Sequence, residues 1–379
     1  MEIFDVVVAG AGGMGTAAAV HLAQRGVRVL CLDRFPLAHD RGSSHGQTRL
    51  IRLAYYEHPD YVPLLERAYQ LWRDLETASG RRLLVEAGLV MAGPAGCELV
   101  TGAERSARLH DLSLDRLGAA EVRRRWPAFV VPDDWELVHE SRGGYLLVEA
   151  CVRAHAEVAK RAGAEFRHGV EIHGWRRRGD AIELDTTLGP IAAGKLALCP
   201  GAWAANLLRL PSMPLRVVRK SQFWFDPPAA HRPIHAAGVM PCFAFDTPTG
   251  FFYGFPALDD RGLKVAEHTG GRPVADPLAL DCAIDATERH AIECFLAAHV
   301  PNAAGRLSDH AACLYTMSPD SHFVLGLHPD EPRVAIAAGF SGHGFKFASV
   351  VGEVLADLAI DGSTEHPIRF LSPRRRFAV

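Results

Sequence analysis

The 379-residue sequence lacks the features that mark several classes of protein. It has no run of the roughly 18 apolar residues that a membrane helix needs, and its start has neither a basic segment nor a cleavable apolar one. No low-complexity tract interrupts a composition that is 48% hydrophobic and 22% charged. We therefore expect a globular, cytoplasmic protein that does not associate with a membrane.

A surplus of charge is absent as well, since the formal net charge is only -3. Without a basic patch there is no electrostatic case for a nucleic-acid partner, and a small-molecule partner is favoured. The eight cysteines lie far apart and form no CxxC pair. This spacing predicts neither a zinc site nor a secreted disulfide framework, so we expect no metal site and mostly buried, reduced thiols.

What the sequence does contain is a strand, a glycine turn and a helix within its first 25 residues. Apolar residues 4–9 predict the strand, and an alanine-rich segment that ends near Arg25 predicts the helix. Between them, Gly10, Gly12 and Gly15 have the G-x-G-x-x-G spacing. This spacing gives a tight turn, lets the backbone approach a pyrophosphate, and lets the helix pack closely on the strand.

A second apolar strand, residues 27–32, supports a dinucleotide site because it ends at Asp33, an acid suitably placed to hold an adenosine ribose. NAD and FAD share this fingerprint, so the motif alone leaves the cofactor open. Its place at the N-terminus, with other site-like motifs spread along the chain, favours an FAD enzyme of the glutathione-reductase type.

The length predicts two domains. Helical periodicity is expected from about residue 59 to 75 and over 147–162, and strands over 83–92 and 195–199. Short aromatic segments between about 215 and 315, such as residues 243–255, predict an antiparallel sheet. A strand, a glycine turn and a helix then recur over 334–338, 339–344 and 347–360.

This organisation predicts an α/β fold: a doubly wound, glutathione-reductase-like FAD-binding domain with a second, mostly antiparallel β-sheet substrate domain of α+β type. The FAD-binding domain is expected to be discontinuous and to comprise residues 1–82, 146–215 and 316–379. The substrate domain is expected to comprise residues 83–145 and 216–315.

The second glycine turn carries Lys346 beside the start of the following helix. A helix N-terminus with a nearby cation suits the pyrimidine edge of an anionic reduced flavin. A plain helix start with an exposed lysine explains the same residues equally well.

Motifs along nearly the whole chain resemble, in order and spacing, the monomeric sarcosine oxidase and N-methyltryptophan oxidase family, FAD-dependent amine oxidases of the D-amino-acid oxidase type. Those motifs are residues 10–15, 42–52, 253–256, 263–264 with 268–269, 313–316 and 339–347. The resemblance implies an oxidase of N-methyl amino acids that contains FAD, uses O2, releases H2O2 and is monomeric. It also implies that FAD is contacted by Gly10, Gly12, Gly15, Asp33, Arg34, Ser43, Thr48, Val170, Gly342, Gly344 and Phe345.

The resemblance also implies roles for three cations. Arg49 would lie against the flavin ring, Arg52 would bind the substrate carboxylate, and Lys264 would promote the reaction of reduced flavin with O2. A planar guanidinium suits bidentate capture of a carboxylate, and a fixed charge near the flavin would stabilise developing superoxide. Loop arginines on the surface and a lysine at a strand edge are the structural alternatives.

Four further positions follow from the same resemblance. Cys313 matches the cysteine that forms a thioether with the flavin, although a buried free thiol is the alternative. Tyr253 and His268 match residues near the substrate amine, and His268, with an ordinary pKa near 6.5, is expected to titrate in the working range unless it is only a packed structural histidine. Lys346 matches the second cation at the carboxylate.

Ala244 occupies the position of a bulky methionine in sarcosine-specific members, and we expect Phe243 and Phe245 to make the pocket apolar. A larger secondary amino acid, or a cyclic one such as pipecolate or proline, therefore ranks level with sarcosine.

The competing function is a flavin dehydrogenase that passes electrons to a quinone or an electron-transfer protein. A non-catalytic flavin protein and a nicotinamide enzyme are disfavoured, because Arg52, Lys346 and Cys313 would then have no purpose.

Overall fold

The apolar strands at the start of the chain form the centre of an eight-stranded sheet in the computed structural model, which describes residues 3–376. Its parallel part has the order β20-β12-β1-β2-β9. These strands are β1 (Ile3–Ala9), β2 (Val29–Asp33), β9 (Glu165–His168), β12 (Ile191–Leu198) and β20 (Val334–Ala338), and β19 (Val324–Leu327) pairs antiparallel with β20. The predicted first, second and last strands are confirmed to within two residues.

Four helices cover one face of this sheet. They are α1 (Gly13–Gln24), α2 (Val62–Ser79), α5 (Val148–Arg161) and α9 (Ala348–Ile360). Small side chains let α1 and α9 approach closely: a Cβ added to Gly352 would lie 2.5 Å from the backbone of Ala17. The alanine-rich sequence of α1 is therefore a packing requirement for the layer that carries the first glycine turn.

The opposite face packs on the short helix α6 (Ala204–Leu208) and on residues of an antiparallel ribbon, β10 (Ile172–Arg178) and β11 (Ala181–Thr186), which belongs to the same sheet because β11 pairs with β12. Trp175 and Ile182 of the ribbon are buried there against Val7 of the central strand. One face is thus covered mainly by helices and the other mainly by strands.

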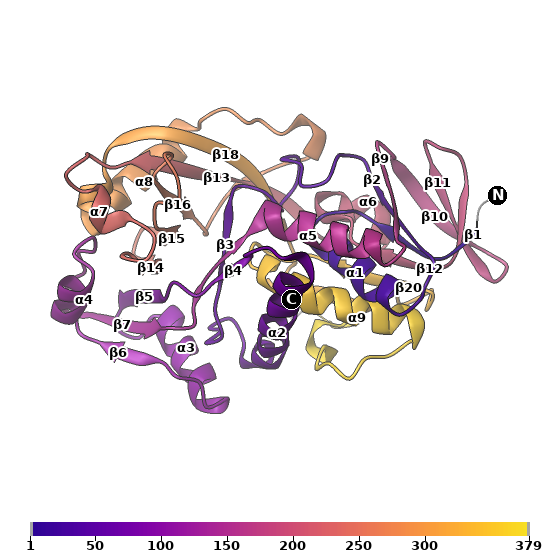
Figure 1. The fold of residues 1–379 in the computed structure, drawn as a ribbon, viewed down its shortest axis with the longest axis horizontal. Coiled ribbons are helices and arrows are strands. Elements are labelled where there is room, and N and C mark those ends of the chain that lie inside the picture. The colour runs from indigo at the N-terminus through magenta and orange to yellow at the C-terminus, as the bar shows by residue number, and fades with distance from the viewer. Residues whose placement is uncertain (1–2, 377–379) are drawn as a thin grey trace.

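The second large sheet has nine strands in the order β17-β13-β16-β15-β14-β5-β7-β6, with β18 on the other edge of β13. All pairs are antiparallel except β14 with β5, as expected for the segment after 215. The strands are β5 (Leu89–Pro94), β6 (Asp115–Leu117), β7 (Trp135–Glu140), β13 (Arg216–Asp226), β14 (Cys242–Thr247), β15 (Gly250–Phe255), β16 (Leu263–Glu267), β17 (Arg272–Pro273) and β18 (Arg306–Met317). Figure 1 shows the two large sheets toward opposite ends of the long axis, with β13 and β18 of the second sheet running toward the middle of the molecule.

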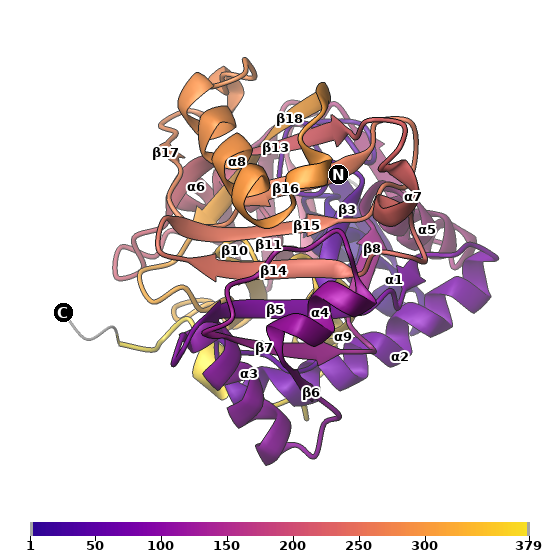
Figure 2. The ribbon, with the colours of Figure 1, turned by 90° about the vertical axis from the view of Figure 1, so that its left-hand side faces the viewer.

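The outer face of the second sheet carries its own core, which packs against α8 (Ala286–His299) as Figure 2 shows. Phe243 and Phe245 lie in this core, with centroids 5.9 and 6.0 Å from that of Phe295. The expectation that they line the substrate pocket is therefore wrong. Alternate residues of a strand face opposite sides of the sheet, so only Ala244 between them faces inward.

A three-stranded sheet joins the two halves, with β3 (Thr48–Ile51), β8 (Gly144–Leu147) and β4 (Leu84–Val85) in the order β3-β8-β4. The single strand predicted over 83–92 is corrected to β4 and β5, because the chain turns at Gly88 with φ +77°. The other helices are α3 (Glu98–Leu109), α4 (Ala119–Arg125) and α7 (Arg232–His235).

The predicted fold class is confirmed. The chain enters the eight-stranded sheet three separate times, and the strands between these visits form most of the nine-stranded sheet. The proposed domain boundaries at 82, 145, 215 and 315 stay a prediction. Within residues 3–376, no helix has the length and apolar character needed to span a bilayer.

Candidate active site

One cavity of about 410 Å³ runs from the first glycine turn to the inner face of the nine-stranded sheet. Most of the predicted site residues lie in its wall: Gly10, Gly12, Asp33, Arg34, Ser43, Arg49, Arg52, Val170, Tyr253, His268, Gly342, Gly344, Phe345 and Lys346. Five predicted residues lie behind this wall, namely Gly15, Thr48, Ala244, Lys264 and Cys313. The fold therefore brings together motifs that are more than 330 residues apart in the sequence.

The first glycine turn is held in a conformation that only glycine permits. Gly10 has φ +105°, and a Cβ there would lie 2.2 Å from the Cys199 carbonyl oxygen. A Cβ on Gly15 would lie 1.7 Å from the Gly10 carbonyl oxygen. A Cβ on Gly12 would meet nothing closer than Ser44 Oγ at 3.7 Å, so Gly12 leaves its space to the cavity.

The acid after β2 shapes the same turn. Asp33 Oδ2 accepts a hydrogen bond of 2.6 Å from the Ala11 backbone N–H. Gly12, the N-cap of α1, supplies no side-chain cap, and the first turn of α1 has no acidic residue. The N-terminus of α1 therefore offers its partial positive charge to the cavity, as a pyrophosphate site requires. These residues fit the FAD that the sequence predicts.

The second glycine turn lies across the cavity from the first. Gly342 has φ +81° and a Cβ there would lie 2.2 Å from the ring of Tyr315, while a Cβ on Gly344 would lie 2.4 Å from Phe340. Phe345 reaches back to the first turn, since a Cβ on Gly13 would lie 2.9 Å from its ring. The two turns thus enclose one space and require small residues for contact with each other and with a ligand.

Strand β3 places Arg49 in the wall. Its guanidinium donates to the carbonyl oxygens of Thr48 and Ser43 at 2.9 and 2.8 Å. The Ser43 hydroxyl donates to the Leu314 carbonyl at 2.5 Å, which ties the loop before β3 to β18. Arg49 is thus held by the chain itself, with one face toward the cavity.

Arg52 is 4% exposed and its charge is balanced inside the protein. It donates to both oxygens of Glu57, at 2.8 and 2.6 Å, and lies over the rings of Tyr55 and Tyr56. Burial raises the pKa of Glu57, but Arg52, His343 and Lys346 outweigh it and lower that pKa to about 2. Glu57 therefore stays ionised. Its carboxylate binds the guanidinium of Arg52, the group that we expected from the sequence to bind the substrate carboxylate.

Lys346 lies beside the same cluster in a short 3₁₀ helix at Phe345–Phe347. Its Nζ donates to the His343 carbonyl at 2.7 Å, and the Tyr55 hydroxyl lies 2.5 Å from His343 Nδ1. Burial and the charge of Arg52 lower the pKa of Lys346 well below its usual range. Since an anion favours the charged form of a lysine, a bound carboxylate would oppose this lowering of the pKa of Lys346.

Tyr253 and His268 form the wall near the nine-stranded sheet. The Tyr253 hydroxyl lies 3.3 Å from that of Tyr315 on β18. Burial, with a smaller contribution from His343, lowers the pKa of His268 to about 3. The expectation that His268 titrates in the working range is therefore wrong, and its imidazole is neutral at neutral pH.

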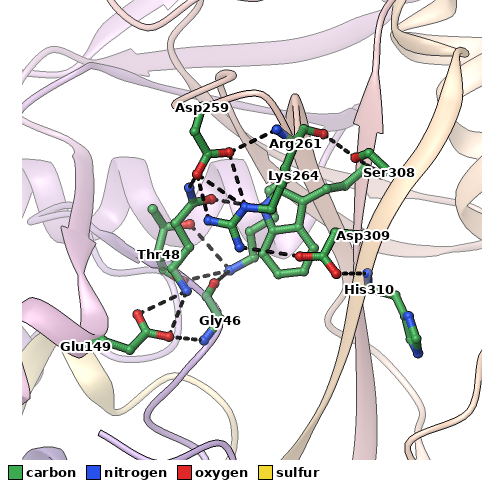
Figure 3. A network of polar contacts seen from close by, with 11 residues as sticks. Gly46, Thr48, Glu149, Asp259, Arg261, Lys264, Ser308, Asp309 and His310 are labelled. Atoms are coloured by element: carbon green, nitrogen blue, oxygen red, sulfur yellow. Dashed lines mark hydrogen bonds and ion pairs between the residues drawn. The ribbon is translucent and has the colours of Figure 1, made fainter.

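Lys264 lies behind the wall, in contact with the start of β3, the strand that carries Arg49. Its Nζ donates to the carbonyl oxygens of Gly46 and Thr48 at 2.5 and 2.9 Å. Figure 3 shows these contacts continuing to Glu149, which accepts from the Gly46 N–H at 2.6 Å. Burial, and secondly Arg49, lower the pKa of Lys264 well below its usual range.

Cys313 and Ala244 face the cavity side of their strands without forming its surface. Cys313 is 1% exposed and lies opposite Lys220 of β13, two residues before the cavity-lining Tyr315 on the same face of β18. Ala244 lies opposite Tyr253 of β15.

Sequence reasoning did not assign roles to Glu57, Tyr56, Tyr315 or Phe251, which also line the cavity. Only Tyr315 had a signal, its two-residue spacing from Cys313.

Comparison with known proteins places this cavity in a family. Residues 5–358 match the FAD dependent oxidoreductase family. The monomeric sarcosine oxidase of Streptomyces avermitilis is 40% identical over 380 residues, which cover 99% of this chain and 98% of that protein. The N-methyl-L-tryptophan oxidase of Yersinia pestis (strain Pestoides F) is 34% identical over 363 residues, which cover 94% and 95%.

Solved structures agree in fold. NikD, an unusual amino acid oxidase essential for nikkomycin biosynthesis, has a TM-score of 0.86 and 25% identity over 100% of this chain and 99% of its own. Glycine oxidase from Geobacillus kaustophilus has a TM-score of 0.82 over the whole of both chains at 21% identity, which supports the fold alone. The chain therefore belongs to the FAD-dependent oxidoreductases, in the family of monomeric sarcosine oxidase and N-methyl-L-tryptophan oxidase.

Proposed function

We propose that the protein oxidises the C–N bond of N-methyl or other secondary amino acids to an imine that hydrolyses, while O2 is reduced to H2O2. The observation that carries this proposal is that one cavity joins a dinucleotide-type glycine turn to two buried cations, Arg52 and Lys346. The relatives named sarcosine oxidase and N-methyl-L-tryptophan oxidase support the same substrate class.

FAD would be held by the two glycine turns, with its pyrophosphate at the N-terminus of α1 and Asp33 at its ribose. The chemistry that bound FAD supplies is the acceptance of a hydride from the carbon next to the amine, and later the transfer of two electrons to O2. Arg34 and Val170 line the same end of the cavity. Arg49 would contact the flavin ring, as the family resemblance implies.

The substrate carboxylate would bind where Glu57 lies now. Arg52 offers a bidentate guanidinium, the geometry that suits a carboxylate, and Lys346 lies beside it. Binding then requires Glu57 to give up its contacts of 2.8 and 2.6 Å with Arg52. Exchange of one carboxylate for another keeps the buried guanidinium paired, so the cost of an unpaired charge is avoided.

The amine must be unprotonated when it loses a hydride, and the surrounding charges favour that state. His268 is neutral, and the Tyr253 and Tyr315 hydroxyls are uncharged because burial raises their pKa values. Arg49 and Arg52 lie in the same wall. Nearby cations lower the pKa of an amine, so Arg49 and Arg52 would help it release its proton.

The pocket also bears on the size of the substrate side chain. Tyr56 and Phe251 form an aromatic wall, with ring centroids 6.0 Å apart, beside Tyr253. An apolar substituent larger than hydrogen suits this wall. We therefore rank bulkier N-methyl amino acids and the cyclic pipecolate and proline level with sarcosine.

Cys313 would carry FAD as a thioether. It is buried on β18, where it is the register partner of Lys220 on β13 and lies two residues from the cavity-lining Tyr315. Acid precipitation tests this point, because a covalent flavin stays yellow with the pellet and a free flavin leaves with the supernatant. The monomeric state and the cytoplasmic location stay predictions.

The function itself is tested with purified protein in air, by following H2O2 release from sarcosine, other N-methyl amino acids, pipecolate and proline. We expect peroxide in proportion to the O2 consumed. Oxidation of these substrates only when an artificial electron acceptor is added would instead support the alternative, a dehydrogenase that passes electrons to a quinone or an electron-transfer protein.

A further inference from the structure

The buried side-chain amide of Gln222, beside Gly46, has no hydrogen-bond partner among the described residues. Gln222 of β13 is 1% exposed, yet neither its Oε1 nor its Nε2 makes a hydrogen bond to any residue within 3–376. Leaving a buried polar group unpaired is costly, so such an amide is expected to bind a polar ligand or water.

The backbone around this amide is shaped to make room for it. A Cβ on Gly46 would lie 2.3 Å from Gln222 Oε1, and Gly46 has φ +87°. The Gly46 carbonyl also accepts the hydrogen bond from Lys264 Nζ. Gln222 and Lys264 therefore meet at one residue, and their strands place them on the same face as diagonal neighbours, since Trp224 pairs with Lys264 and Gln222 with Ala266.

A second unpartnered group lies next to Gly46. His45 is 4% exposed, and its Nε2 has no hydrogen-bond partner among the described residues. Burial, with Arg49 as the next cause, lowers the pKa of His45 to about 4, so the ring is neutral and has one donor and one acceptor nitrogen. The Gln222 amide and the His45 imidazole thus both have buried polar atoms without a partner among the described residues, and both adjoin Gly46.

A second cleft, of about 430 Å³, lies next to this place. His45, Gly46, Trp224 and Ala311 line it, and Ala311 is the register partner of Gln222. The Trp224 ring forms part of its floor, with Arg261 and Lys264 Nζ 5.1 and 5.3 Å from the ring centroid. Figure 3 shows Arg261 and Lys264 in one network together with Asp259 and Asp309 at this end.

We propose that Gln222 and His45 hold water beside Lys264, and that this water brings from the second cleft the proton that O2 needs to become H2O2. This inference rests on the proposed oxidase function. In the overall step O2 takes two electrons and one proton from the anionic reduced FAD, takes the second proton from this water path, and leaves as H2O2. The path is separate from the cavity that admits the amino acid.

The test separates the reaction with O2 from the reaction with the amino acid. Holoenzyme reduced with dithionite is mixed with O2 in H2O and in D2O, for the wild type and for Gln222→Leu, with Gln222→Met as a second variant of similar length. Ser221→Ala is the matched control. Ser221 directly precedes Gln222 in β13, and its hydroxyl donates a hydrogen bond to Glu288, away from Gly46 and Lys264.

We expect both Gln222 variants to be reoxidised roughly tenfold more slowly, with a larger solvent isotope effect, and Ser221→Ala to match the wild type. Anaerobic reduction by the amino acid should be unchanged in all of them. A crystal structure of the wild-type holoenzyme should show water bonded to the Gln222 amide.

Gln222 variants that are reoxidised at the wild-type rate with the wild-type isotope effect would overturn this inference alone, as would a dry amide in the crystal. A wild type that the amino acid reduces but O2 does not reoxidise would overturn the oxidase function and this inference with it.

Discussion

The two ends of the main cavity are built in different ways. At the α1 end, the cradle for the cofactor is backbone: Gly10 and Gly15 are in contact so close that no side chain fits between them. At the other end, the substrate pocket is made of buried charged side chains, with Arg52 and Glu57 paired at 2.6 Å. One end is shaped by close backbone contacts, whereas the other holds buried charged side chains that can exchange partners.

The difference explains how each end is expected to respond to change. Backbone contacts cannot relax without moving α1 and β1, so damage there affects folding and cofactor binding together. In a buried ion pair, by contrast, a ligand with the same charge as one partner can replace that partner, so the other partner stays paired. Substitutions at the first end should therefore cost stability, and those at the second should mainly change substrate affinity.

The largest effect is expected from Gly15→Val. Its Cβ would lie 1.7 Å from the Gly10 carbonyl, so the turn must open, at a cost of about 3 kcal/mol or more. Little folded, FAD-loaded protein should be recovered, as measured by the flavin-to-protein ratio and Tm. Gly12→Ala is the matched control: it should keep the Tm of the flavin-free protein, because no protein atom lies within 3.4 Å of its Cβ, but weaken FAD binding. Equal Tm losses in both would contradict the distinction.

Lys264→Met should slow reoxidation of the reduced enzyme by O2 by roughly 10²–10³-fold, the effect of removing one preorganised electrostatic group. The rate of anaerobic reduction by the amino acid should stay within a few-fold of the wild type. Lys160→Met, on the exposed face of α5, is the control for loss of a lysine. If the reductive step fell as far as the oxidative one, the assignment of Lys264 to the reaction with O2 would be wrong.

Arg52→Leu removes the guanidinium that is expected to bind the substrate. A charge-assisted bidentate contact of about 2–3 kcal/mol corresponds to a Kd raised roughly 30- to 150-fold. The variant also leaves Glu57 buried without its partner, so Arg52→Leu combined with Glu57→Gln is needed to separate affinity from stability. Anaerobic titration of the flavin spectrum measures Kd, and an unchanged Kd in the double variant would remove Arg52 from the binding site.

Acid should destabilise both ends through their buried histidines. Burial lowers the pKa of His155 to about 3. This residue lies in α5, one of the helices that cover the eight-stranded sheet. Burial lowers the pKa of His343, beside Glu57, to about 4. Between pH 6.5 and these values the unfolded chain binds protons that the folded chain does not. Stability is thus full above pH 6.5 and falls on acidification, by about 1.4 kcal/mol per pH unit for each histidine.

Urea unfolding at pH 7 and pH 5 measures this slope. His155→Phe should make it shallower by about 1.4 kcal/mol per pH unit without changing substrate affinity. A slope equal to that of the wild type would mean that His155 titrates normally in the folded protein.

The smallest effect is expected from Glu57→Gln. If Glu57 competes with the substrate carboxylate for Arg52, its loss should lower KM roughly fivefold, or about 1 kcal/mol. A raised KM would show instead that Glu57 is needed to hold Arg52 in place.

Sequence alone predicted the end made of backbone better than the end made of side chains. The G-x-G-x-x-G spacing and Asp33 are local signals, and both turns are present as expected. Resemblance was needed to assign Arg52 and Lys346, because no local pattern says that residues nearly 300 positions apart meet. Glu57 was missed although it is only five residues from Arg52, because both lie in an irregular segment between β3 and Pro59, where no helix or strand periodicity predicts which side chains meet.

The errors have separate origins. Phe243 and Phe245 were placed in the pocket together with Ala244, although successive residues of a strand face opposite sides and the three cannot all line one pocket. The pKa of His268 was taken as ordinary because burial is invisible in the sequence. The turn that divides β4 from β5 depends on one glycine of positive φ within an alternating segment.

The central claim is that one cavity holds FAD at its backbone end and an amino-acid carboxylate at its charged end. Anaerobic mixing of the holoenzyme with sarcosine or a larger N-methyl amino acid, compared with the same amine lacking the carboxylate, tests it most directly. We predict that the amino acid bleaches the flavin and the simple amine does not, and that admission of O2 restores the colour. Equal bleaching by both, or no bleaching by any secondary amino acid, would contradict the account.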